Sequence, residues 1–177
     1  MTPPLQYVAM GLLVVALNVT VNGYDLIADP LGWLVFLFGA LPLRRVLPGG
    51  ETLVGFAGLA GAVSVVLFVP WVRDQLSASG QWAVSVPQTV VLIVVCNALA
   101  SAAEAAADPI AGRFRILRTA FIVLLFAPAV VLGGNLPTLV PVVAVVAVLA
   151  LLYCVYLLFR VSKREWLVPE QSPDPAA

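Results

Sequence analysis

Asn22-Gly-Tyr-Asp-Leu-Ile-Ala-Asp-Pro-Leu-Gly-Trp33 is the stretch that decides the fold, because it separates the first two apolar runs of the chain. The runs on either side of it, 5–18 and 34–43, are predominantly apolar. Inside the break, Asp25 and Asp29 are four residues apart, and a proline, a glycine and a tryptophan follow. Aspartate is a good helix N-cap and proline a good first helical residue. The stretch therefore predicts a turn and then a helix that begins at Asp29.

The whole chain is far more apolar than a soluble protein. It has 177 residues, of which 62% are hydrophobic and 10% are charged, and its mean hydropathy is +1.07. A soluble chain carries about 25% charged residues, so this chain is expected to have the lipid bilayer as its main partner. The formal net charge of zero gives no reason to expect nucleic acid as a partner.

Several chemistries are disfavoured by composition. The chain contains no histidine, which excludes a Ser-His or Cys-His hydrolase and removes the commonest zinc ligand. Cys96 and Cys154 both fall in apolar runs, where cysteines behave as small hydrophobic residues rather than as a disulfide or metal site. No catalytic residue and no cofactor are predicted, and the question of a metal stays open. The N-terminus lacks the basic region of a signal peptide, so the first apolar run is expected to stay as a helix.

The apolar runs predict an all-α integral membrane bundle, because a helix needs about 20 apolar residues to cross the hydrocarbon. Six transmembrane helices are expected in a domain that covers residues 1–164. Their predicted ranges are 5–23, 29–43, 52–72, 82–106, 116–134 and 138–159. The tail, 165–177, is rich in Pro, Glu, Ser and Gln and is expected to be disordered on the cytoplasmic side.

The basic residues predict the orientation of this bundle. With six spans, one side of the membrane holds eight of the nine basic residues and the other side holds Arg73 alone. The eight are Arg44, Arg45, Arg113, Arg115, Arg118, Arg160, Lys163 and Arg164. Cytoplasmic loops are enriched in Lys and Arg, so both termini are expected in the cytoplasm. The preference for Arg over Lys and the abundance of Ala, Val and Leu point to a bacterium, and hence to a multi-pass protein of its cytoplasmic membrane.

Gly55, Gly58 and Gly61 recur every three residues in the third predicted span. Small residues at such spacing let two helices approach closely in a membrane. The glycines therefore predict either ordinary packing inside the bundle or a face for a homo-oligomer or a membrane-protein partner.

A weak internal repeat appears when the sequence is shifted by 79 residues. It places Asn18 over Asn97, Asn22 over Ser101, Asp25 over Glu104, Ala28 over Ala107, Asp29 over Asp108, Pro30 over Pro109 and Leu31 over Ile110. Under the six-span topology the two copies lie on opposite sides of the membrane. Two three-helix units of opposite orientation are typical of transporters with inverted repeats. The alternative is that Asp-Pro, a good helix start, was used twice.

The opening stretch also resembles a hallmark of small uncharacterised bacterial membrane proteins. These proteins carry Asp-Leu-Leu-Pro-Asp, two further residues, and then Gly and an aromatic residue where their second helix begins. In this chain the matching residues run from Asp25 to Trp33, with Ala28 in place of the first proline and Pro30 after the second acid. The resemblance covers about a sixth of the chain. It implies a membrane protein of unknown activity and assigns no catalytic role.

The outer acidic residues form the first candidate site for an ion or a polar substrate, together with Asn18 and Asn22. Asp25 and Asp29 would share one face of a helix, and neighbouring carboxylates are common in proton and cation sites. The 15 residues from Asp29 to Leu43 span only about 22 Å of helix, against about 30 Å of hydrocarbon. Asp29 is therefore expected below the outer surface, in a watery recess of the bundle or in locally thinned bilayer. The alternative is an exposed loop followed by a capped helix.

The inner acidic residues, Glu104 and Asp108, form the second candidate site, with Asn97 on the same helix face as Glu104 and deeper in the membrane. Because Arg113, Arg115 and Arg118 follow closely, ion pairing near the membrane surface is the simpler interpretation. Asn97 can equally be an interhelical hydrogen-bonding residue.

Three functions remain open from the sequence. The first is a small transporter or channel-like protein for an ion or small polar substrate. The second is a non-catalytic membrane scaffold or assembly partner that uses the glycine face. The third is a lipid-modifying membrane enzyme in which Asp25 and Asp29 hold a metal; few charged residues lie on the outer side, so an enzyme is disfavoured.

Overall fold

Six long helices and several short elements make up the computed structural model, which describes residues 3–16, 20–21, 24–25 and 29–167. The long helices are α1 Pro4–Ala16, α2 Asp29–Leu43, α3 Gly50–Leu67, α5 Ala78–Ala105, α6 Ala111–Gly133 and α7 Val140–Val161. The short elements are β1 Thr20–Val21, β2 Tyr24–Asp25, the helix α4 Pro70–Asp74 and the 3₁₀ turns η1 Pro137–Leu139 and η2 Glu165–Leu167. The two strands pair antiparallel, with Thr20 opposite Asp25.

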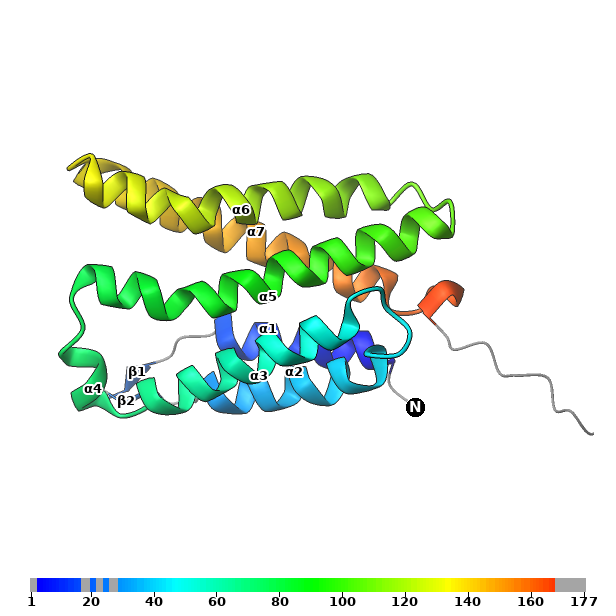
Figure 1. Cartoon of the computed structure of the whole chain (residues 1–177), viewed down its shortest axis with the longest axis horizontal. Coiled ribbons are helices and arrows are strands. Elements are labelled where there is room, and N and C mark those ends of the chain that lie inside the picture. The colour runs from blue at the N-terminus through cyan, green and yellow to red at the C-terminus, as the bar shows by residue number, and fades with distance from the viewer. Residues whose placement is uncertain (1–2, 17–19, 22–23, 26–28, 168–177) are drawn as a thin grey trace, which may run out of the picture.

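Successive long helices run in alternating directions and lie side by side (Figure 1). Each contacts the next along the chain, and α7 returns to contact α1, which closes a ring of six helices. Two groups of three are visible, α1–α3 and α5–α7, joined where α3 meets α5 and where α1 meets α7. The α2–α3 turn, the α5–α6 turn and the end of α7 all lie at one end of the bundle.

Four of the described helices are long and apolar enough to cross a membrane: Gly50–Leu67, Ser79–Ala105, Ala111–Val131 and Val140–Val161. The other two, α1 and α2, are apolar but have only 13 and 15 residues. At 1.5 Å per residue they span about 20 and 22 Å, less than the roughly 30 Å of a typical hydrocarbon core. The strand pair follows α1 and precedes α2.

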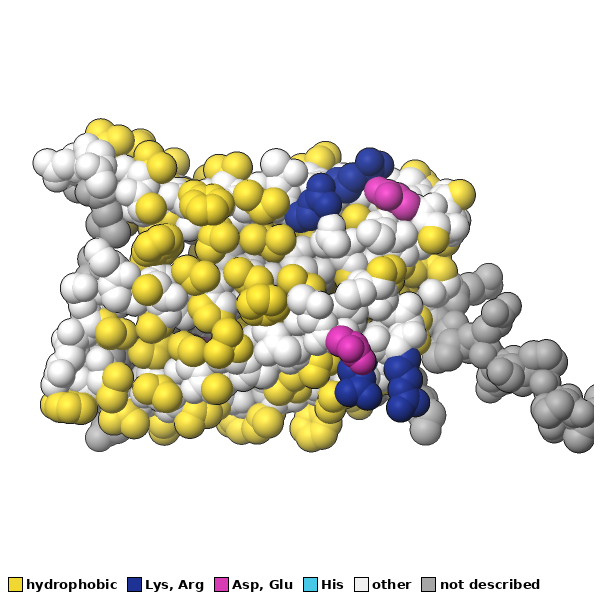
Figure 2. Space-filling model, viewed as in Figure 1, with side chains coloured by type: hydrophobic (Ala, Val, Ile, Leu, Met, Phe, Trp, Pro, Cys, Tyr) yellow, Lys and Arg dark blue, Asp and Glu magenta, His cyan; other side chains and the backbone are white. Residues whose placement is uncertain are grey.

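Charge is concentrated at the end of the bundle that holds the α2–α3 and α5–α6 turns, which we call the basic end. Its basic residues are Arg44 and Arg45 after α2, Arg113, Arg115 and Arg118 early in α6, and Arg160, Lys163 and Arg164 at the end of α7. Figure 2 shows the visible Lys and Arg side chains toward this end, with acidic side chains beside them and mainly apolar surface elsewhere. Arg73 and Asp74 lie in α4, at the opposite end.

Glycine brings α1 and α2 into close contact. A Cβ atom on Gly11 would lie 2.5 Å from the Phe36 amide nitrogen and 2.6 Å from the Gly32 carbonyl oxygen. A Cβ on Gly39 would likewise meet the backbone of Pro4 and Val8. The two helix backbones therefore touch directly, as small residues allow in membrane proteins.

The glycines of α3 behave differently from one another. A Cβ on Gly55 or Gly58 would meet no atom within 4 Å, whereas one on Gly61 would lie 3.3 Å from the Trp33 Cβ. Within the chain, α3 buries Ala57 and Ala60 instead. The use of Gly55 and Gly58 by a second protein stays a prediction.

Several predicted boundaries need correction. The first helix was expected to reach residue 23 but ends at Ala16, and the strand pair follows, where Thr20 and Val21 are β-branched and favour extended backbone. The third predicted span is divided between α3 and α4, because Pro70 cannot donate the hydrogen bond that would continue α3.

Two more corrections concern the basic end. Helix α6 begins at Ala111, five residues before the predicted start, because Ile110 and Phe114 are buried and bring the preceding polar segment into the fold. The first three residues of the predicted disordered tail form η2, which buries Leu167 against the bundle. Residues 168–177 lie outside the described part of the chain.

Candidate functional site

The predicted outer site falls partly outside the described residues. Asn18 and Asn22 are not described, and Asp25 is described only through its backbone, which pairs with Thr20. Asp29 is half-buried in the first turn of α2, where the negative charge of an acidic residue stabilises the helix through its dipole. Asn97, Glu104 and Asp108 lie toward the other end, in the second half of α5 and just beyond it. The described structure thus separates Asp29 from the inner polar residues.

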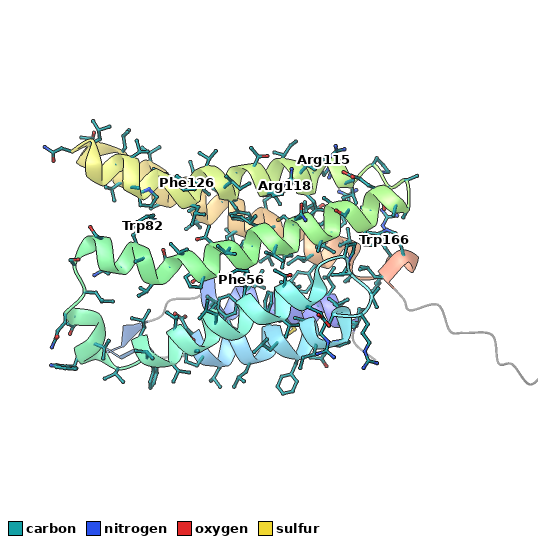
Figure 3. All side chains as sticks on the ribbon, in the orientation of Figure 1. Phe56, Trp82, Arg115, Arg118, Phe126 and Trp166 are labelled. Atoms are coloured by element: carbon teal, nitrogen blue, oxygen red, sulfur yellow. The ribbon has the colours of Figure 1, made fainter. Side chains whose placement is uncertain are left out.

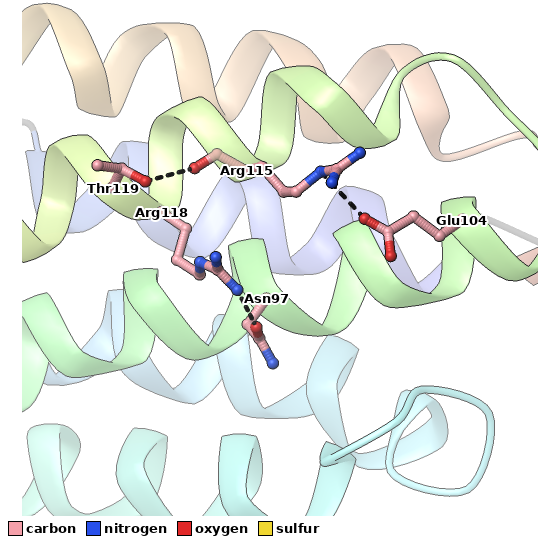
Figure 4. Close-up of polar contacts among 5 residues, drawn as sticks. All are labelled: Asn97, Glu104, Arg115, Arg118 and Thr119. Atoms are coloured by element: carbon pink, nitrogen blue, oxygen red, sulfur yellow. Dashed lines mark hydrogen bonds and ion pairs between the residues drawn. The ribbon is translucent and has the colours of Figure 1, made fainter.

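The inner polar residues form two bridges between α5 and α6 (Figure 4). The Arg115 Nε atom lies 3.0 Å from Glu104 Oε1, and both side chains are about half exposed. Farther along the two helices from the basic end, Arg118 Nη1 donates a 2.7 Å hydrogen bond to Asn97 Oδ1 on the exposed surface of the bundle. The ion pair neutralises Arg115, whereas Arg118 has a neutral partner. We call Asn97, Glu104, Arg115 and Arg118 the α5–α6 polar seam.

Asp108 joins the α5–α6 turn to the C-terminal segment. The preceding residue, Ala107, has a φ of 54°, which ends α5, and Asp108 Oδ1 accepts a 3.1 Å hydrogen bond from the Ile110 amide. The other carboxylate oxygen accepts a 3.3 Å hydrogen bond from Trp166 Nε1 and lies 3.7 Å from Arg164 Nε. The Ile110 amide, and after it Trp166 and Arg164, hold the pKa of Asp108 below its ordinary value against the opposing effect of partial burial.

We expect the contact between Asp108 and Trp166 to be lost in acid. Because the pKa of Asp108 is lowered in the folded chain, its stabilising effect is fully present above the unfolded value of about 3.9 and disappears as pH falls through the lower folded value. The indole N–H signal of Trp166, followed by ¹⁵N NMR in detergent, should therefore move only below about pH 4. Asp108→Asn should abolish this titration and Asp74→Asn should not. A signal that titrates identically in Asp108→Asn would show that another group controls the contact.

A second site lies in the half of the bundle opposite the basic end, among α5, α6 and α7. A pocket of about 440 Å³ opens there, and most of its wall is apolar. Trp82 lies between α5 and α6 beside it, and its Nε1 atom donates a 3.0 Å hydrogen bond to the Leu125 carbonyl (Figure 3). Pro128 also lines the pocket. It has no backbone N–H, so it cannot donate the helical hydrogen bond to the Leu124 carbonyl.

Loose helix packing makes this pocket possible. In the half of the bundle toward the basic end, the Cys96 Sγ atom on α5 lies 3.9 Å from the Cys154 Sγ atom on α7, and both thiols are free and buried. Toward the opposite end, described side chains in 78–90, 122–136 and 140–153 are half-buried or exposed, except for buried Val131. The three helices are therefore closed at the basic end and open at the other.

One face of α5 supplies the polar groups of the pocket: Gln81, Ser85, Gln88 and Thr89. The hydroxyl groups of Ser85 and Thr89 donate to backbone carbonyls of α5, at 2.7 and 3.3 Å, which leaves their oxygens free to accept. Within the described structure the Gln88 amide has no hydrogen-bond partner. The pocket thus offers donors and acceptors without a charged side chain in its lining.

Sequence reasoning did not single out this polar face of α5. Its positions, separated by four, three and one residues, lie on one side of a helix. That spacing inside an apolar span was the available signal. Among the described residues, no group of three or more His, Cys, Asp or Glu side chains is placed to hold a metal ion.

No family model, no curated protein and no solved structure matches this chain. What the chain does must therefore be inferred from the pocket, the polar seam and the charge at the two ends.

Proposed function

We propose that this chain is a six-span protein of the bacterial cytoplasmic membrane, with both termini in the cytoplasm, that works as a small transporter for a small polar substrate. The collection of eight of nine basic residues at one end supports this orientation. It makes the basic end cytoplasmic and the opposite end external. Short helices α1 and α2 can complete the six spans where the bilayer thins locally.

The single observation that carries the transport proposal is the pocket among α5, α6 and α7. Binding sites of transporters lie within the membrane between helices and are lined by a few polar groups. The described side chains around it are half-buried or exposed toward the proposed external end and more often buried toward the basic end, which supports a binding site that faces outward. Amide and hydroxyl groups without charged neighbours favour an uncharged hydrogen-bonding solute over an ion.

A second pocket, of about 600 Å³, lies on the α3–α4 side of the same stretch of α5 and shares Gln81, Ser85 and Gln88 with the first. Asp74 lines it. The polar face of α5 therefore borders two recesses in the same half of the bundle. A 3+3 inverted repeat, and a role for Asn18, Asn22, Asp25 and Asp29 at the external mouth, stay predictions.

Ala147→Cys in a chain with Cys96→Ala and Cys154→Ala tests the proposal, because Ala147 lines the pocket without supplying one of its polar groups. We expect spheroplasts that express it to take up xylitol several-fold faster than spheroplasts without the chain. A membrane-impermeant thiol reagent added outside should then block uptake, because it reaches the pocket. The matched variant Thr52→Cys places its thiol in the exposed first turn of α3 at the basic end, where the external reagent should have no effect.

A different result would favour the scaffold alternative. If xylitol uptake equals that of control spheroplasts and Gln88→Leu changes nothing, the pocket is not a pathway. The exposed Gly55 and Gly58, which face open space on α3, would then be the stronger feature. They would mark the face on which a second copy or another membrane protein packs.

A further inference from the structure

Arg118 is placed where a membrane protein rarely leaves a charge. It lies seven residues after the start of α6 at Ala111, which is about 10 Å along the helix axis. Its partner Asn97 lies eight residues before the end of α5 at Ala105, about 12 Å along that helix. Long basic side chains near the end of a spanning helix normally extend toward the aqueous surface. Arg118 instead reaches across to Asn97 (Figure 4).

The charge of Arg118 is not balanced inside the described part of the chain. Its one hydrogen bond there goes to the neutral Asn97 amide oxygen. Its Nε atom is buried and lacks a partner. Glu104, the acidic residue of the polar seam, lies against Arg115 instead. Charged groups within spanning helices are normally paired, so a guanidinium with an unpartnered Nε–H is suited to bind an anion.

The surface around Arg118 suits an amphiphile. Along α6, Arg115, Thr119, Ile122 and Phe126 are exposed and spaced by four, three and four residues, so they share one face. This face is cationic near the basic end and apolar farther along, and Figure 3 shows Arg115, Arg118 and Phe126 in that order on α6. A phospholipid is complementary to this face, because its anionic phosphate is followed by apolar acyl chains.

We propose that the α5–α6 polar seam binds the phosphate of an anionic phospholipid in the cytoplasmic leaflet, with Arg118 as the deep ligand and Asn97 as the residue that positions it. The planar guanidinium fork matches phosphate oxygens in a bidentate geometry. Arg115, paired with Glu104, lies at the rim of the site. The lipid's acyl chain follows the apolar face of α6. The choice of leaflet rests on the orientation proposed above, whereas the binding measurement does not depend on transport.

Asn97→Asp is the decisive variant. The new carboxylate is nearly the same shape as the amide and would pair with Arg118, which removes the unbalanced charge without removing the contact. We expect the purified full chain to bind dioleoyl-phosphatidylglycerol in detergent, seen by native mass spectrometry, more tightly than dioleoyl-phosphatidylcholine. Asn97→Asp should weaken phosphatidylglycerol binding at least about tenfold while its thermal stability without lipid stays equal or rises.

Thr52→Asp is the matched control, because it adds the same charge at the same end of the bundle on the exposed start of α3. It should leave lipid binding unchanged, and Arg118→Gln should lose it as Asn97→Asp does. Equal loss in Thr52→Asp would show that only the overall charge matters and would overturn the site. So would equal affinity for the two lipids. Displacement of phosphatidylglycerol by millimolar inorganic phosphate would identify free phosphate, rather than lipid, as the ligand.

Discussion

Gly11→Leu is expected to abolish the folded state of the purified chain. The Cβ of any residue at position 11 would lie 2.5 Å from the Phe36 amide nitrogen and 2.6 Å from the Gly32 carbonyl oxygen. Both are backbone atoms, so no side-chain rotation relieves the clash and α1 must move away from α2. Overpacking costs about 1–3 kcal/mol where side chains can adjust. Separating two backbones removes most of an interface from a fold whose total stability is on the order of 5–15 kcal/mol.

The matched control is Gly58→Leu. Nothing lies within 4 Å of a Cβ at position 58, so the variant should unfold at the wild-type temperature. Thermal unfolding in detergent, followed by size-exclusion chromatography, measures both variants. If Gly58→Leu keeps its melting temperature but elutes at a smaller size than wild type, Gly58 contributes to an oligomer. Equal melting temperatures for Gly11→Leu and wild type would contradict the close α1–α2 contact.

The contrast between these glycines shows where sequence reasoning stops. Regular spacing on α3 identifies a face with small side chains, but it does not say whether a helix of the same chain covers that face. Gly11 has no such spacing, and its importance arises because α2 presents Gly32 and Gly39 to α1. A contact between two helices depends on both partners, and one sequence shows each partner only separately.

Helix starts were predictable where the signal is local. Asp29 followed by Pro30 marks the beginning of α2, and the structure begins the helix there. The end of α1 was not predictable in the same way. Residues 12–17 are all apolar, and apolar and polar residues alternate only from Leu17 to Asn22. A count of the residues needed to cross a bilayer therefore extended the helix too far. Four helices long and apolar enough to span a membrane confirm the coarse prediction of a helical membrane-type fold.

The candidate sites also differ in whether their contacts are local in the sequence. Glu104 and Arg115 are close in sequence and lie on consecutive helices joined by a tight turn, so an ion pair between the inner acids and these arginines was predictable. The partners of Asp108 in the C-terminal segment, Arg164 and Trp166, depend on how α7 returns to the basic end. The polar face of α5 was visible in the spacing, but the pocket beside it exists only because α6 and α7 separate from α5 there.

Trp33→Ala is expected to destabilise the fold by about 3 kcal/mol, near the lower end of the range for large core aromatics. The Trp33 side chain is only 2% exposed and lies against Phe36, with ring centroids 5.4 Å apart. It also contacts α3, where the position of a Gly61 Cβ would be 3.3 Å from the Trp33 Cβ. In lipid the transfer part of this cost is small, because the surroundings are already apolar. The loss of dispersion contacts around the new cavity remains.

Trp71→Ala separates this packing effect from the general effect of losing a tryptophan. Trp71 lies in α4 and is 69% exposed, so its removal should change the free energy of unfolding by no more than about 0.5 kcal/mol. Unfolding of both variants in mixed micelles of rising SDS content gives the comparison. A larger loss of stability in Trp33→Ala than in Trp71→Ala would show that Trp33, the last residue of the stretch that begins at Asn22, is the packing contact between α2 and α3. Equal shifts in the two variants would mean that Trp33 acts at the membrane surface, as interfacial tryptophans do, and not as the packing contact between these helices.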